Sequence, residues 1–312
     1  MGTPDFAVPS LDILVQNGLN VVAVITSTDK YGGRGGKKLI ESAIKKYAVS
    51  KEIAVLQPKN LKNPEFLEEL ASYKADMQLV VAYRMLPVVV WDMPKLGTYN
   101  LHGSLLPRYR GAAPINWAII NGDKYTGVTT FKLKHAIDTG DLMYQEKVQI
   151  TEDDNAGSVH DKMMIVGANL VLKTVKSIIS ADYQTFPQDE SQVSMAPKIF
   201  HETCEIDFNK SSDEIYNFVR GLCPYPGAWM TLDGLEMKVF DTERSFEDNI
   251  ATAGTIITDD KRYIKVAASD GYIILNDVKL QGKKRMDIKS FLNGYKMNEA
   301  LLLLKVRKKL KL

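Results

Sequence analysis

Two short runs of apolar, largely β-branched residues restrict the fold more than any other feature of the chain. They cover residues 21–26 (VVAVIT) and 77–83 (MQLVVAY) and lack the polar alternation of a half-exposed strand. Such runs are typical of strands that are covered on both faces in a parallel sheet. Between them, Asn63 followed by Pro64 and helically spaced apolar residues predicts a helix. We therefore predict an α/β domain with a doubly wound, mostly parallel sheet over residues 1–190.

The second part of the chain has a different pattern. A length of 312 residues is sufficient for two domains of ordinary size. Residues 191–206 contain Pro197 and lack periodicity, so we predict a linker there. Helical spacing resumes after Ser211, and short segments separated by turn residues follow it. This pattern predicts a small, mainly β domain over residues 207–312.

Charge is distributed unevenly along the chain. The whole chain carries +2, but residues 279–312 hold eleven Lys or Arg against Asp287 and Glu299 and so carry +9, which leaves −7 for residues 1–278. This asymmetry indicates an end of the protein that faces nucleic acid. A basic tail that is merely solvated is the alternative that the charge pattern alone leaves open.

Several protein classes do not fit the composition. No apolar run reaches the length of a membrane span, and the N-terminal residues, with Asp5 and Asp12 and no basic residue, do not resemble a signal peptide. We therefore expect a cytoplasmic protein. Cys204 and Cys223 have no metal-like spacing, and buried thiols are their simplest interpretation, with one disulfide as the alternative.

The segment NLHGSLLP, residues 100–107, holds the strongest candidates for chemistry. Asn100 and His102 would point the same way at the end of a strand, because side chains alternate along it. The glycine and proline that follow break regular structure and shape a loop beside the pair. An amide donor and a titratable imidazole suit the stabilisation of a developing oxyanion. A capped turn with a hydrogen-bonded histidine is the alternative for the pair alone.

Further segments match one family of enzymes, in family order along nearly the whole chain. Asp138 in the segment HAIDTGD is the third candidate catalytic residue. Together with residues 100–114, the chain resembles the folate-dependent formyltransferases, and most closely those that act on methionyl-tRNA. The other matching segments are GTPDFAVP (2–9), GRGGKK (33–38), PYPGA (224–228) and LQGKKRM (280–286).

The resemblance implies a Rossmann-like first domain, an OB-like β-barrel as second domain, and a reaction. The co-substrate 10-formyltetrahydrofolate would give its formyl group to the α-amino group of methionine on initiator methionyl-tRNA, for translation initiation. Asn100 and protonated His102 would hold the formyl oxygen. Asp138 would favour the charged imidazole and help to remove the proton of the amine. No metal is required, and we expect a monomer.

The resemblance also implies binding residues. Arg84 departs from the small residue expected at its position, which affects the rim of the folate pocket. A solvated surface loop is the alternative for the basic, glycine-rich stretch around Arg34. The expected folate-binding residues are Met85, Leu86, Ser104, Leu105, Leu106 and Pro107, and the expected tRNA-binding residues are Arg34, Lys37, Lys38, Lys283, Lys284 and Arg285.

Three other functions compete with this interpretation. A formyltransferase for glycinamide ribonucleotide would not need the second domain, and one for amino sugars would not need the basic loop and tail. A non-enzymatic RNA-binding module would leave Asn100, His102 and Asp138 without a purpose. A nucleotide-dependent dehydrogenase is disfavoured because no G-x-G-x-x-G follows a predicted strand.

The start of the sequence carries one more expectation. In the family, the segment GTPDFAVP follows a short apolar strand at the centre of the sheet. Here only Met1 precedes it, so the strands at 21–26 and 77–83 should flank an empty slot. We expect Met1 to be an internal methionine of a longer natural protein.

Overall fold

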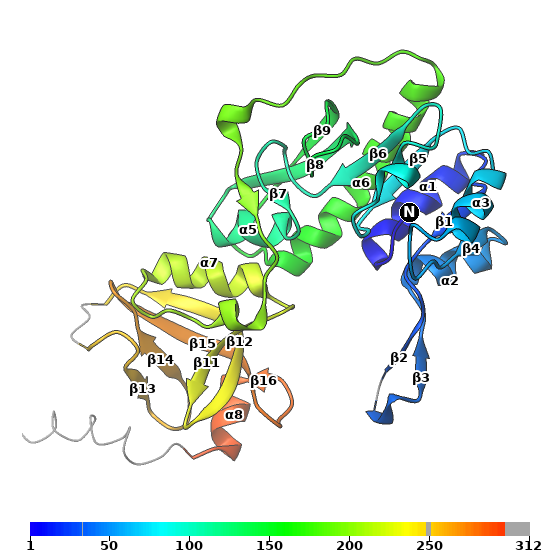
Figure 1. Ribbon diagram of the computed structural model, residues 1–312. Helices are drawn as coiled ribbons and strands as arrows, with labels where there is room; N and C mark the ends of the chain where they lie inside the picture. The colour runs from blue at the N-terminus through cyan, green and yellow to red at the C-terminus, as the bar shows by residue number, and fades with distance from the viewer. Residues whose placement is uncertain (33, 248–250, 297–312) are drawn as a thin grey trace, which may run out of the picture. The chain divides into compact units, whose positions relative to one another are not determined.

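The computed structural model describes residues 1–32, 34–247 and 251–296, and the chain divides into two compact units (Figure 1). The first unit comprises residues 1–114, 125–149 and 159–197. The second comprises residues 115–124, 150–158 and the chain from 198 onward. Each unit therefore takes its segments from both halves of the sequence.

The first unit alternates helices and strands, as the apolar runs predict. Its elements in chain order are η1 (Asp5–Ala7), α1 (Val8–Gln16), β1 (Ala23–Ile25), β2 (Lys30–Gly32), η2 (Arg34–Gly36), β3 (Lys38–Ile40), α2 (Ala43–Ser50), β4 (Ala54–Leu56), α3 (Pro64–Ser72), β5 (Gln78–Val81), α4 (Val88–Trp91), β6 (Thr98–His102), β7 (Arg110–Gly111), β8 (Tyr125–Lys132), β9 (Leu142–Gln149), α6 (Ala156–Ile179), η3 (Glu190–Gln192) and β10 (Met195–Ala196).

Helices cover both faces of the sheet in this unit. Strands β5, β6, β8 and β9 pair in that order, with β5 and β6 parallel, and β1 pairs in parallel with β4. Val80 of β5 packs with residues of α3 on one face, and Tyr99 of β6 packs against Ile178 of α6 on the other. The predicted helix begins where expected, because the Asn63 side chain accepts a hydrogen bond from the backbone N–H of Glu65. The doubly wound α/β fold is confirmed.

A strand-sized slot separates β1 from β5, as expected. Among the described residues, the first two of the chain bridge it: Gly2 N donates to Ile25 O at 3.1 Å, and Val81 N donates to Met1 O at 2.9 Å. Beyond them lies a cavity of about 570 Å³ that apolar side chains of both strands, α1 and α6 line. The amine of Met1 donates to Leu79 O at 2.6 Å, and burial lowers its pKa to about 5. The β1–β4 pair and the β5–β6–β8–β9 sheet are thus separated by a gap at the edges formed by β1 and β5.

Strands β2 and β3 form a hairpin that extends away from the rest of its unit (Figure 1). Polar contacts hold the two ends of the hairpin. Lys45 of α2 forms ion pairs with Asp29 on one side and with Glu41 on the other. The hydrogen bond from Lys45 lowers the pKa of the Asp29 carboxyl. Thr26 and Ser42 share a hydrogen bond of 2.8 Å between their hydroxyl groups. The root of the hairpin is therefore fixed to α2.

The second unit is built around an antiparallel sheet. Its strands pair in the order β11-β12-β15-β14-β13, and β16 pairs with β15. The pairing of β12 with β15 shifts register around Asp241. The elements are α5 (Pro114–Ile120), η4 (His201–Cys204), α7 (Ser212–Leu222), β11 (Ala228–Leu232), β12 (Leu235–Ser245), β13 (Ile256–Thr258), β14 (Ile264–Ala267), β15 (Tyr272–Leu280), β16 (Met286–Asp287) and α8 (Ile288–Gly294).

The sheet curls into a half-barrel rather than a closed barrel. Its two edge strands, β11 and β13, do not pair with each other within the described residues. Helix α7 begins with the predicted capping box, in which Ser211 and Glu214 each bond to the other's backbone N–H. Cys204 and Cys223 are buried free thiols, and burial raises the pKa of both.

The predicted linker, residues 191–206, is divided between the two units, because residues 191–197 belong to the first unit and residues 198–206 to the second. Residues Met195–Ala196 pair in parallel with Arg110–Gly111, and Phe186 exchanges backbone hydrogen bonds with Leu142. The contacts divide after Pro197, whereas the sequence suggests boundaries at 190 and 206. In the described part of the chain, no helix is both long and apolar enough to cross a membrane.

Candidate active site

Asn100 and His102 lie on one face of β6, two residues apart. Strand β6 is held on both edges, because it pairs with β5 on one side and β8 on the other. His102 is buried and Asn100 is partly buried. Among the described residues, the side-chain amide of Asn100 makes no hydrogen bond, so its N–H groups can donate to a substrate. A rigid central strand thus carries both side chains.

The imidazole of His102 lies between two acceptors. Its Nε2 is 2.8 Å from the backbone oxygen of Tyr109, and its Nδ1 is 3.7 Å from Oδ2 of Asp138. A backbone carbonyl can only accept, so Nε2 carries the proton of that bond. The separation of Nδ1 from the Asp138 carboxylate is within ion-pair range but longer than a hydrogen bond. The structure therefore brings a carboxylate next to the second nitrogen of the imidazole.

Asp138 is held in the loop between β8 and β9. Its Oδ2 accepts a hydrogen bond of 2.9 Å from the backbone N–H of Gly111. Asp138 has φ +54° and Tyr109 has φ +62°, in the left-handed region that residues other than glycine rarely adopt. Such conformations persist only where surrounding contacts fix them, and they cluster at functional sites. The structure thus brings Asp138 to His102, as the sequence suggests.

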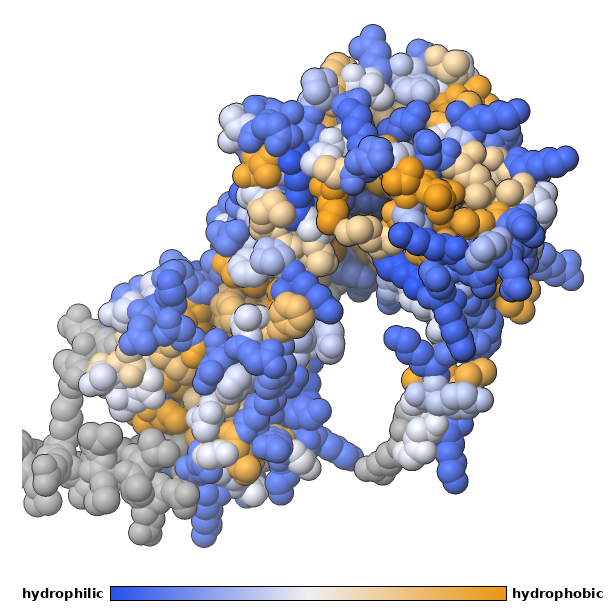
Figure 2. All heavy atoms as spheres, viewed as in Figure 1, coloured by the Kyte–Doolittle hydropathy of each residue, from blue (hydrophilic) through white to orange (hydrophobic). Residues whose placement is uncertain are grey.

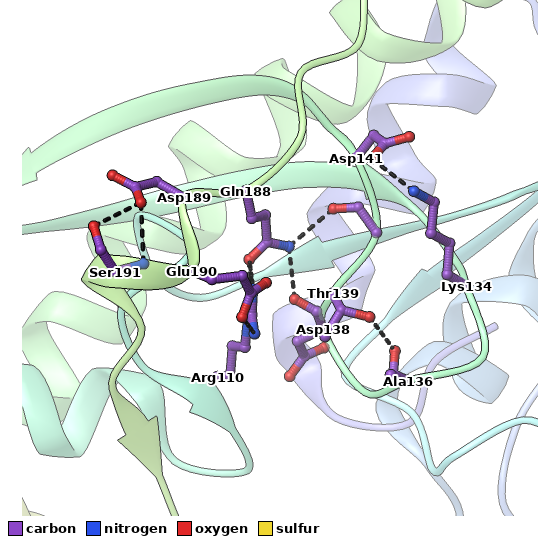
Figure 3. Close-up of polar contacts among 11 residues, drawn as sticks. Arg110, Lys134, Ala136, Asp138, Thr139, Asp141, Gln188, Asp189, Glu190 and Ser191 are labelled. Carbon is purple, nitrogen blue, oxygen red and sulfur yellow. Dashed lines mark hydrogen bonds and ion pairs between the residues drawn. The ribbon is translucent and has the colours of Figure 1, made fainter.

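A segment after α6 reaches this loop, and sequence reasoning missed it (Figure 3). The Gln188 amide contacts the Asp138 loop and the guanidinium of Arg110. Arg110 also forms an ion pair with Glu190, and its hydrogen bond lowers the pKa of the Glu190 carboxyl. The stretch around Gln188 has no periodicity and no recognisable motif, so only three-dimensional contacts reveal its place.

The segment Ser104–Pro107 forms a tightly bonded turn. Thr129 donates to the backbone oxygen of Ser104 at 2.6 Å and accepts from the backbone N–H of Leu106 at 3.1 Å. Gln145 donates to the backbone oxygen of Leu106 at 2.7 Å. These polar groups of the backbone are already engaged by protein. A ligand here would therefore meet mainly side chains and the remaining backbone groups of the turn.

The other predicted folate residues lie in different surroundings. Leu86 is buried in the core formed by α3, α4 and the neighbouring strands, whereas Met85 is 72% exposed. Leu105 and Pro107 are partly buried. The Arg84 guanidinium donates to the backbone oxygens of Pro58 and Lys59, which ties it to the end of the β4 region. Folate binding by these residues stays a prediction.

The predicted tRNA-binding residues fall into two groups. Arg34, Lys37 and Lys38 belong to the β2–β3 hairpin, whose visible surface is mostly hydrophilic (Figure 2). Lys283 and Lys284 are exposed between β15 and β16. Arg285 is instead paired with Asp277 at 2.7 Å. The basic residues 305–312 lie outside the described residues.

The remaining histidines have structural contacts. His135 makes an edge-to-face contact with Trp91, at 5.5 Å between ring centroids. His160 contacts the ring of Phe6, and His201 stacks on Trp229. Neither the 570 Å³ cavity nor its lining includes Asn100, His102 or Asp138. No group of three or more potential metal ligands occurs in the described ranges.

Family models match both parts of the chain. Residues 1–175 match the model described as Formyl transferase, and residues 198–296 match that described as Formyl transferase, C-terminal domain. Together with the strand-borne Asn100 and His102 and their partner Asp138, these matches define the class of the protein. The chain belongs to the formyl transferase family.

Comparison with individual curated proteins indicates which formyl transferases this chain is similar to in sequence. Proteins named methionyl-tRNA formyltransferase from Azobacteroides pseudotrichonymphae and Parabacteroides distasonis are each 53% identical to this chain, over 94% and 95% of it and 94% of each relative. Among solved structures, an N-formyltransferase from Helicobacter canadensis in complex with folinic acid and dTDP-3-aminofucose is similar, with a TM-score of 0.66. Its identity is 23%, over 91% of this chain and 97% of that one, so it supports the fold alone.

Proposed function

We propose that the protein transfers the formyl group of 10-formyltetrahydrofolate to the α-amino group of methionine on initiator methionyl-tRNA. The observation that carries the proposal is the buried His102 between two acceptors, one of them Asp138, beside the unengaged amide of Asn100. The high identity to relatives of that name, over nearly their full length, supports the choice of acceptor. The protein acts in the cytoplasm as a monomer.

The geometry suits an oxyanion-forming acyl transfer. The neutral amine attacks the formyl carbon, a C–N bond forms, and the carbonyl electron pair moves to oxygen. The amide of Asn100 and Nε2–H of His102 hold this oxygen, which replaces the Tyr109 carbonyl as the acceptor of His102. Asp138 stabilises the imidazolium and accepts the proton of the attacking nitrogen through water. The oxyanion then re-forms the carbonyl, the bond from the formyl carbon to N10 of tetrahydrofolate breaks, and N10 takes up the proton that Asp138 accepted.

The β2–β3 hairpin is the first candidate surface for the tRNA. It carries Lys37 and Lys38 as exposed cations and Tyr31, which is 75% exposed. Basic residues with an exposed aromatic ring suit an RNA end, because cations contact phosphates and the ring can stack on a base. The ion pairs of Lys45 fix the root of the hairpin, so the arm is presented in a defined direction.

Formylation of three acceptors tests the proposal. We expect the protein to formylate charged initiator tRNA at least about 100-fold more efficiently in kcat/KM than charged elongator tRNA. Glycinamide ribonucleotide should not react. Radiolabelled formyl transfer, measured with 10-formyltetrahydrofolate as donor, gives the comparison. Preferential formylation of glycinamide ribonucleotide or of an amino sugar nucleotide would refute the assignment of the acceptor.

Arg34→Ala is expected to raise KM for charged initiator tRNA at least about tenfold, because one charge-assisted phosphate contact is worth about 1.5–3 kcal/mol. The value of kcat at saturating tRNA should change little, since Arg34 is assigned to binding. Steady-state kinetics at two salt concentrations provide the measurement. Lys62→Ala, which removes an exposed cation elsewhere in the first unit, is the control and should behave as the wild type. An unchanged KM in Arg34→Ala would place the RNA contact elsewhere.

A further inference from the structure

A closed ring of hydrogen bonds runs through Asp138, and Figure 3 draws the part of it that joins Asp138, Gln188 and Arg110. The carboxylate of Asp138 accepts from Gly111 N at 2.9 Å, and its backbone oxygen accepts from Gln188 Nε2 at 2.7 Å. Gln188 Oε1 accepts in turn from Arg110 Nε at 3.0 Å. Because Arg110 is the chain neighbour of Gly111, the ring closes. Both the side chain and the backbone of Asp138 are held by groups distant in sequence.

The amide of Gln188 uses its full bonding capacity. Its Nε2 also donates to the backbone oxygen of Gly140 at 2.9 Å, and its Oε1 also accepts from Arg110 Nη2 at 2.8 Å. Carbonyls only accept and a guanidinium only donates, so the orientation of the amide is determined. A carboxylate at this position would repel the two carbonyl oxygens, and an apolar side chain would remove the Gln188 partner of both carbonyl oxygens and of Arg110 Nε.

The outer half of the ring is itself fixed. The Arg110 side chain is buried at 7% exposure, and its guanidinium donates to both carboxylate oxygens of Glu190, at 2.8 and 3.1 Å. The backbone of Arg110 and its neighbours pairs with β10: Arg110 N donates to Ser194 O at 2.9 Å, and Ala112 N donates to Ala196 O at 2.8 Å. The segment 188–196 is thus bound to the strand that carries Gly111 through both side-chain and backbone contacts.

We propose that Gln188 is a positioning residue that fixes the loop of Asp138 for formyl transfer, an inference that rests on the proposed function. Asp138 has φ +54°, so its own conformational preference does not hold the loop in place. The carboxylate must face His102, and a misplacement of about 1 Å at a catalytic group can cost about 100-fold in rate. Gln188 acts through Asp138 and contacts neither substrate.

The test compares Gln188→Glu and Gln188→Met with the wild type. We expect both variants to lower kcat at least about tenfold, with Gln188→Glu more affected, while KM for each substrate stays within about twofold. In an Asp138→Ala background, measured in single turnovers, Gln188→Glu should lower the rate by less than about twofold, because the group it positions is absent. Thermal melts show whether each variant is folded, and Gln188→Met carries the test if Gln188→Glu is not.

Gln192→Met is the matched control, because Gln192 lies in the same segment and is exposed, and among the described residues its side chain donates only to Asp189. It should retain the wild-type kcat. Wild-type kcat in folded Gln188 variants, or an undiminished effect of Gln188→Glu in the Asp138→Ala background, would overturn the inference. Formylation of initiator tRNA by the wild type is measured first, so a failure of the proposed function is seen separately.

Discussion

Replacing His102 by Ala, or Asp138 by Asn, is expected to lower kcat at least about 100-fold while KM for 10-formyltetrahydrofolate changes little. Both side chains act on charge that develops only in the transition state, and the loss of one oxyanion donor typically costs about 3–4 kcal/mol of barrier. Asp138→Asn keeps an acceptor for Gly111 N but removes the negative charge next to His102. Single-turnover rates and folate titration separate the two effects.

His135→Ala is the matched control for this prediction. His135 lies in the same loop region as Asp138, yet its ring packs on Trp91 and it is exposed. Its removal should change kcat by less than about threefold, because no reacting group depends on it. If His135→Ala were more damaging than His102→Ala, the assignment of catalytic roles would be wrong.

Filling the slot between β1 and β5 with an added strand is expected to raise the free energy of unfolding. A segment of five or six apolar, β-branched residues fused before Met1 can enter the 570 Å³ cavity and pair with both strands. Each buried polar group that gains a partner contributes about 1–3 kcal/mol, so we expect the free energy of unfolding to rise by about 3 kcal/mol or more. Thermal and urea melts measure it. An extension of equal length in Gly and Ser should give no such gain.

The pH dependence of the melts tests the buried amine of Met1, which any N-terminal extension, including the Gly and Ser control, removes. The pKa of the buried Met1 amine is lowered from its ordinary 8.0 to about 5. Between these values the unfolded chain binds more protons, so stability should rise as the pH increases from about 5 to 8. The extension turns this amine into an amide, and this part of the pH dependence should disappear. Equal melting behaviour of both proteins at every pH would show that no strand enters the slot.

Local signals in the sequence predicted the scaffold well. The capping residues Asn63 and Ser211 mark the starts of α3 and α7, and the apolar runs mark β1 and β5. Such features depend on near neighbours in the chain, and a single sequence displays them directly. The pairing of His102 with Asp138 required the family resemblance, because no local pattern connects residues 36 positions apart.

The supporting contacts of the site were beyond sequence reasoning. Gln188 reaches Asp138 across 50 residues and Arg110 across 78, from an aperiodic stretch at the end of the predicted first domain. Arg285 reads as an RNA-binding cation, yet it bonds to Asp277 and stacks over the ring of Phe240. In both cases the tertiary structure determines the hydrogen-bond partner of a polar side chain, and the neighbouring residues in the sequence do not indicate it.

The second unit is assembled from three stretches of chain, and this limits how the protein can be dissected. Arg220 of α7 donates to the backbone oxygens of Thr151 and Asp154, which come from the middle of the sequence. A fragment that begins at residue 198 lacks these acceptors and also lacks α5. During synthesis, residues 115–124 and 150–158 leave the ribosome long before α7 does. The second unit therefore cannot complete its fold around these two early stretches until the later segments of the chain have been synthesised.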